Sequence, residues 1–97
     1  MTKQDLAIVA MLENLIATKF PSASVEALGF SHYALSIPSS SALQSIKIVV
    51  GYVRSSLRCN VIVGQANGNL SHLRSRSGFR YLGYAVRYAE TLISELK

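Results

Sequence analysis

Residues 72–87 contain the side chains that are best suited to contact an anionic ligand. They are His72, Arg74, Arg76, Arg80, Tyr84 and Arg87. Guanidinium groups bind phosphate oxygens through paired N–H donors, and a tyrosine between them can stack on an exposed base. We predict that a helix begins near Ser77, and that the basic residues and the tyrosine beyond that point share one face, turned away from the apolar stripe. The pattern predicts a nucleic-acid-binding surface at the start of the last helix.

The charge distribution also favours an anionic partner. From position 27 to position 89 the chain has no Asp or Glu, whereas it has one lysine and six arginines there. The formal net charge of the whole chain is +5 at pH 7. Because no carboxylate is close in sequence to most of these basic side chains, their fields should add over the surface and attract anionic molecules. This expectation concerns association and not the fold.

Two further arginines could enlarge the basic surface. Arg54 and Arg58 flank a turn that we predict at residues 55–57, and they would contribute if that turn lies on the same side as the last helix. A simpler interpretation of the whole set stays open, since a helix needs a solvated face and arginine favours helices. Glu90 is also close enough to Arg87 for an ordinary surface ion pair. The preceding segment, rich in Ser and Arg, would then be a plain exposed loop.

Residues that could support catalysis or bind a metal are few and far apart. Catalysis by paired carboxylates needs two acids at one site, and the five acids of the chain fall mostly on predicted helix surfaces. His32, His72 and Cys59 do not have metal-ligand spacing. Cys59 also lies in an apolar run, where a thiol usually acts as a small buried hydrophobic group. We therefore expect no enzymatic activity, no catalytic residue, no metal and no cofactor.

Length and composition indicate a small intracellular protein. With 97 residues, 49% of them hydrophobic, the chain is expected to form one domain over residues 1–97 around one core. A homodimer would cover apolar surface, and Tyr81 and Tyr88 are expected to pack at such a contact or at the rim of the core. The lone cysteine excludes an internal disulfide and fits a cytoplasmic location. The apolar runs are much shorter than the roughly 20 residues that span a bilayer, so no membrane partner is expected.

The first part of the chain shows the patterns of a helix and two strands. Thr2 and Asp5 have the spacing of a capping box. Apolar residues then recur every three or four positions up to about Phe20, where the following proline ends the predicted helix. Residues 24–37 alternate apolar with polar or small side chains around a turn at residues 29–31. They are predicted to form two short strands, for which a hairpin is the natural pairing.

Residues 42–57 are the ambiguous part of the chain, because they fit both a helical and an extended repeat. The serines before residue 42 favour a helix start, whereas the density of β-branched residues and the internal Gly51 favour a strand over residues 45–54. We prefer the strand. A second strand is predicted at residues 58–65, followed by a loop and by a closing helix with a long apolar stripe.

Together these elements predict an α+β fold, in which a small antiparallel sheet of three to four strands packs against the N-terminal and C-terminal helices. The order resembles that of double-stranded RNA-binding domains, whose last helix presents cations to phosphates, but the lysine-rich start of that helix is missing here. Two hypotheses follow. The chain is either a small nonenzymatic protein that contacts DNA or RNA phosphates, or an inhibitor or adaptor that docks a basic face on an acidic protein. In the second case Arg80, Tyr81 and Tyr84 are the expected anchors.

Overall fold

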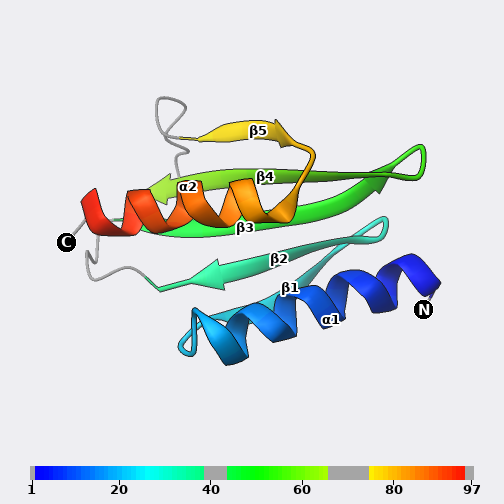
Figure 1. The fold of residues 1–97 in the computed structure, drawn as a ribbon, viewed down its shortest axis with the longest axis horizontal. Helices are drawn as coiled ribbons and strands as arrows, with labels where there is room; N and C mark the ends of the chain where they lie inside the picture. The colour runs from blue at the N-terminus through cyan, green and yellow to red at the C-terminus, as the bar shows by residue number, and fades with distance from the viewer. Residues whose placement is uncertain (1, 39–43, 66–74, 96–97) are drawn as a thin grey trace.

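The structure, a computed structural model, describes residues 2–38, 44–65 and 75–95. These residues form two helices and five strands (Figure 1). In chain order the elements are α1 (Lys3–Thr18), β1 (Ser24–Gly29), β2 (His32–Ile37), β3 (Gln44–Val53), β4 (Ser56–Gln65), β5 (Arg76–Phe79) and α2 (Leu82–Glu95). The strands form one sheet in the order β1-β2-β3-β4-β5, and every neighbouring pair is antiparallel. The predicted α+β class is confirmed, with five strands in place of the three to four expected.

Helix α1 begins with the predicted capping box. The Thr2 hydroxyl accepts a hydrogen bond from the Asp5 amide at 3.1 Å, and Asp5 Oδ2 accepts from the Thr2 amide at 2.9 Å and from the Thr2 hydroxyl at 2.8 Å. These bonds from Thr2 lower the pKa of the Asp5 carboxyl, and the hydroxyls of Ser31 and Tyr33 lower it further. Oδ1 has no hydrogen-bond partner among the described residues. The carboxylate therefore stabilises the fold above its ordinary pKa of 3.8, and this contribution is lost as the pH falls through the lowered value.

The hydrophobic core lies between the two helices and one face of the sheet. Alternate residues of each strand point to this face, and the strand register places Leu35, Ile48 and Val61 side by side across β2, β3 and β4. All three are completely buried. Helix α1 contacts β1 to β3 and α2 contacts β3 to β5, and both lie on the same side of the sheet (Figure 1). The helices add Ile8, Leu12, Leu15, Ala85, Val86, Ala89 and Leu92 to the core.

Neither described helix covers the opposite face of the sheet. This face carries an ion pair in which Lys47 Nζ lies 2.6 Å from Glu26 Oε1. The two side chains meet over β2, where the register places the small residues Ala34 and Ser36 opposite them. Lys47 therefore does not contribute to the unneutralised charge that the sequence suggested, because the sheet brings it to an acid that is distant in the chain.

The β1–β2 and β3–β4 hairpins each turn over only two residues, 30–31 and 54–55, and the flanking residues pair directly. All four turn residues have positive φ, between 51° and 66°. This is the type I′ geometry, which matches the twist of the paired strands. The strand interpretation of residues 42–57 is confirmed over their described part. The predicted turn at residues 55–57 is wrong by about one position. The turn lies at residues 54–55, because β4 already begins at Ser56, which pairs with Val53.

Candidate nucleic-acid interface

The predicted start of the last helix is instead the short strand β5, which pairs with β4. Two side chains tie these strands together. Asn60 Oδ1 accepts a hydrogen bond from the Gly78 amide at 3.0 Å, and the Ser75 hydroxyl accepts one from the Val63 amide at 3.0 Å. Gly78 has a φ of +82°, which a helix does not contain. The prediction of a helix that begins near Ser77 is therefore wrong, and α2 starts at a later residue.

Arg80 and Tyr81 form the bend between β5 and α2. The Tyr81 carbonyl accepts the first hydrogen bonds of the helix, from the amides of Tyr84 at 3.2 Å and Ala85 at 3.5 Å. Arg80 therefore precedes the helix and does not lie on the helical face on which the sequence placed it. The bend nevertheless directs Arg80 to the same surface, because Arg80 lines a depression together with Tyr84 and Arg87.

Strand β5, the bend and one side of α2 together expose a basic and aromatic surface. This arginine–tyrosine surface consists of Arg76, Arg80, Tyr81, Tyr84, Arg87 and Tyr88. Two shallow depressions of about 480 and 610 Å³ lie along it. Tyr81, Tyr84 and Arg87 line both, so the depressions are neighbours. The structure thus brings together four of the residues that the sequence suggested for binding, namely Arg76, Arg80, Tyr84 and Arg87.

Aromatic contacts position four side chains of this surface, those of Arg76, Tyr81, Tyr84 and Tyr88. The guanidinium carbon of Arg76 lies 4.8 Å from the centre of the Tyr88 ring, as in a cation–π contact, and Phe79 packs against the same ring with centroids 5.9 Å apart. Tyr81 and Tyr84 meet edge to face, with centroids 5.7 Å apart and planes at 83°. Tyr81 is 67% exposed and Tyr84 is 58% exposed. These two rings are therefore ordered by each other and still open to a ligand.

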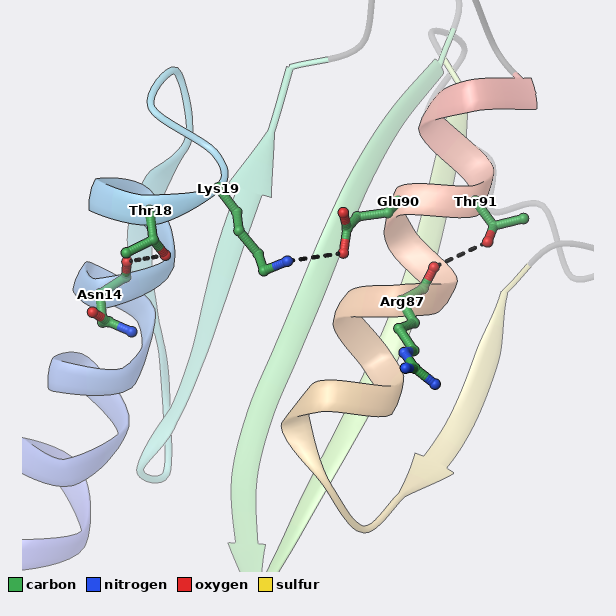
Figure 2. A network of polar contacts seen from close by, with 6 residues as sticks. All are labelled: Asn14, Thr18, Lys19, Arg87, Glu90 and Thr91. Atoms are coloured by element: carbon green, nitrogen blue, oxygen red, sulfur yellow. Dashed lines mark hydrogen bonds and ion pairs between the residues drawn. The ribbon is translucent and has the colours of Figure 1, made fainter.

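Within the described ranges, no carboxylate lies within ion-pair distance of the arginines of this surface. Glu90, the acid closest to Arg87 in sequence, instead pairs with Lys19 at 3.5 Å. Figure 2 shows the Arg87 side chain directed away from this pair. The interpretation of Arg87 as half of a local ion pair with Glu90 is therefore wrong. The positive charges of Arg76, Arg80 and Arg87 can act on an external anion.

The other predicted site residues are not part of the arginine–tyrosine surface. His72 and Arg74 lie outside the described residues. Arg54 lies in the β3–β4 turn and lines neither depression. Arg58 faces away from the helices, because its strand neighbour Cys59 points into the core and side chains alternate along a strand. The two arginines of this hairpin therefore do not extend the surface.

Two tyrosines differ in how well the sequence predicted their positions. Tyr88 packs against the rim of the core, as expected, and also supports Arg76. Tyr81 is 67% exposed, so it does not pack at the rim of the core, and its expected place at a dimer contact stays a prediction. The spacing of Tyr81, Tyr84 and Tyr88 by three and four residues is the signal that could have placed them along one side of the chain.

Cys59 is the one thiol of the chain, and it is completely buried. Burial raises the pKa of this thiol to about 11. The thiolate is the reactive form of cysteine, so this residue is poorly suited to nucleophilic chemistry near neutral pH. Over the part of the chain that the structure describes, no three His, Cys, Asp or Glu side chains gather in a group that could hold a metal ion.

We expect the Cys59 thiol to react with Ellman's reagent far more slowly in the folded protein than in urea, at about pH 8, because access and ionisation both require unfolding. The raised pKa of the Cys59 thiol also makes the folded state less stable at alkaline pH. Between the ordinary pKa of 9.0 and the raised value of about 11, the unfolded chain loses its thiol proton while the folded chain keeps it. The absorbance of the thiolate that Ellman's reagent releases measures the reaction rates in the folded protein and in urea. Equal rates under these two conditions would contradict the buried position of Cys59.

Comparison of the chain with protein-family models, with curated proteins and with solved structures gives no match. Function is therefore inferred from the chemistry of the arginine–tyrosine surface.

Proposed function

We propose that the arginine–tyrosine surface binds single-stranded nucleic acid without catalysis, with its arginines on phosphates and its exposed tyrosines on bases. The observation that carries this proposal is the ordered and exposed Tyr81–Tyr84 pair beside Arg80 and Arg87. Stacking platforms next to positive charge are the usual means by which proteins hold single strands without reading their sequence.

The phosphate contacts follow from the chemistry of arginine. A guanidinium group stays charged at every physiological pH and donates paired hydrogen bonds to phosphate oxygens. Arg80 and Arg87 line the depression around Tyr84. Helix α2 has no acidic residue in its first turn, so the partial positive charge of its N-terminus adds to that of Arg80. A nucleic-acid backbone on this surface would meet several positive charges in succession.

The base contacts favour a single strand over a duplex. Bases within a duplex are stacked on both faces, whereas a single strand leaves base faces free to stack on aromatic side chains. Such stacking contributes about 1–3 kcal/mol per base and depends little on the sequence. Both Tyr81 and Tyr84 are more than half exposed, so each can present part of its ring to a base.

Fluorescence anisotropy with labelled single-stranded DNA, single-stranded RNA and duplexes of matched length tests this proposal at low and moderate salt. We expect single strands to bind about tenfold or more tightly than duplexes, because only single strands gain the stacking contacts. The logarithm of the association constant should fall linearly with the logarithm of the salt concentration. Tighter binding of duplexes, or no binding at low salt, would contradict the proposal.

A second candidate function is docking on an acidic protein. The same exposed pair of tyrosines next to Arg80 favours it, since Tyr and Arg are enriched among the residues that dominate binding energy at protein interfaces. Nuclease treatment of the material retained by the immobilised protein separates the two candidates. Loss of all partners after nuclease supports nucleic-acid binding, whereas one stoichiometric protein that stays bound supports the second candidate.

A further inference from the structure

Exposed apolar side chains outside the arginine–tyrosine surface gather at one end of the molecule. They are Leu6, Leu28, Phe30 and Val53, which we call the apolar tip. Leu6 lies near the start of α1, Leu28 and Phe30 lie at the β1–β2 turn, and Val53 adjoins the β3–β4 turn. In Figure 1 the N-terminus and both turns lie at the same end of the long axis, opposite the C-terminus.

Neighbouring residues connect the three parts of the apolar tip. Asp5 at the start of α1 and Tyr33 at the start of β2 are close enough for the charge of Asp5 to raise the pKa of the Tyr33 hydroxyl, in addition to the larger effect of burial. The His32 ring lies directly over Gly51, where any side chain would collide with it. Gly51 is two residues before Val53 on β3. The start of α1 and the two turns thus form one continuous end of the fold.

Phe30 is the most prominent residue of the apolar tip. It is 99% exposed and has a φ of 51°. Bulky residues rarely adopt this left-handed conformation, and type I′ turns prefer Asn followed by Gly at their two central positions. The turn therefore holds a strained residue whose large apolar ring makes almost no contact within the chain. The positive φ belongs to the turn, whereas contact with a molecule outside the chain would account for the exposure of the ring.

Two exposed cations lie beside the apolar tip. Lys3 at the start of α1 and Arg54 in the β3–β4 turn are both exposed, and neither belongs to the arginine–tyrosine surface. Of the described acids on α1 and β1, Asp5 is buried and accepts hydrogen bonds from Thr2, Glu26 pairs with Lys47, and Glu13 lies further along α1. Exposed apolar side chains beside two exposed cations complement a surface that is anionic at its boundary and apolar below it.

We propose that the apolar tip docks on an anionic lipid membrane, with the Phe30 ring among the upper acyl chains and Lys3 and Arg54 at the headgroups. The tip consists of two turns and a helix end, and a fluid bilayer adapts to such a convex shape, whereas a protein partner would need a matching hollow. Over the described residues, no helix is long and apolar enough to cross a bilayer. The proposed docking is peripheral, so it departs from the sequence-based expectation of no membrane partner, which rested on the absence of a spanning segment. One aromatic anchor with a few cations predicts reversible binding. This proposal uses residues other than those of the proposed nucleic-acid surface and does not depend on it.

Sedimentation with vesicles of phosphatidylcholine, with and without phosphatidylserine, tests this docking. The decisive variant combines Phe30→Asn with Ser31→Gly, because this pair suits a type I′ turn and should fold at least as stably as the parent chain. We expect the parent to bind vesicles that contain phosphatidylserine, and the double variant to bind them about tenfold or more weakly, since the buried ring is lost. The matched control Ser55→Gly relaxes the other turn and should bind like the parent.

Three outcomes would overturn the proposal. The first is equal vesicle binding by the parent and by the Phe30→Asn, Ser31→Gly variant. The second is no binding of the parent to phosphatidylserine vesicles at low salt. The third is a dimer that forms without lipid and that depends on Phe30, as measured by sedimentation velocity. The last outcome would assign the apolar tip to a second copy of the chain. Urea unfolding of the double variant distinguishes lost docking from lost folding. The double variant should bind single-stranded nucleic acid as the parent does, because Phe30 and Ser31 lie outside the arginine–tyrosine surface. The vesicle experiment therefore tests the apolar tip independently of the nucleic-acid proposal.

Discussion

Replacement of both Arg80 and Arg87 by glutamine is expected to weaken the binding of single-stranded nucleic acid by roughly 30- to 150-fold. Glutamine keeps a polar side chain but removes the charge and the paired donors. A loss of about 1–1.5 kcal/mol at each exposed arginine corresponds to this range. Each phosphate contact on a single strand contributes about 0.7 to the salt slope, so the slope should decrease by about 1.4. Anisotropy titrations at several salt concentrations measure both quantities.

The matched control for this variant replaces Arg54 and Arg58 by glutamine. It removes the same charge from the β3–β4 hairpin, which does not belong to the arginine–tyrosine surface. We expect less than about a threefold loss of nucleic-acid affinity, because only long-range attraction is reduced. If both double variants lose affinity equally, net charge governs binding and the arginine–tyrosine surface has no special role.

Replacement of Ile48 by alanine is expected to lower the free energy of unfolding by about 2–5 kcal/mol, because it leaves a cavity where no neighbour can fully collapse. Ile48 is completely buried on the central strand β3, between Leu35 on β2 and Val61 on β4. Both helices pack over this part of the sheet. A domain of this size has a stability of about 5–15 kcal/mol, so the loss is a large fraction of the total. Urea unfolding followed by circular dichroism measures it.

Ile62→Ala is the matched control, since it makes the same chemical change on the other face of the sheet. Ile62 is half-buried and pairs with Lys47 of β3. We expect a loss of less than about 1.5 kcal/mol, because the removed atoms keep partial access to water and leave no closed cavity. Similar losses for Ile48→Ala and Ile62→Ala would mean that both faces are covered, which contradicts the one-sided core.

Elements that depend on interactions within a few residues could be predicted from the sequence. The capping box of α1 joins Thr2 to Asp5 within one helical turn. The β1–β2 hairpin follows from alternating side chains around a short turn. Residues 42–57 remained ambiguous, because their side chains fit two repeats. The ten-residue pairing of β3 with β4 selected the extended form over the described part, since it satisfies the backbone hydrogen bonds of both strands.

The sequence by itself determined which residue types could bind an anion, and the tertiary structure decided where they lie. Strand β5 is too short for a recognisable pattern, and it exists because β4 pairs with it and Asn60 binds Gly78 across 18 positions. This strand and the bend after it place Arg76 and Arg80 beside α2. Lys19 reaches Glu90 across 71 positions, and Glu90 is therefore not the partner of Arg87. Such contacts join segments that are distant in the chain, and no local pattern contains both partners.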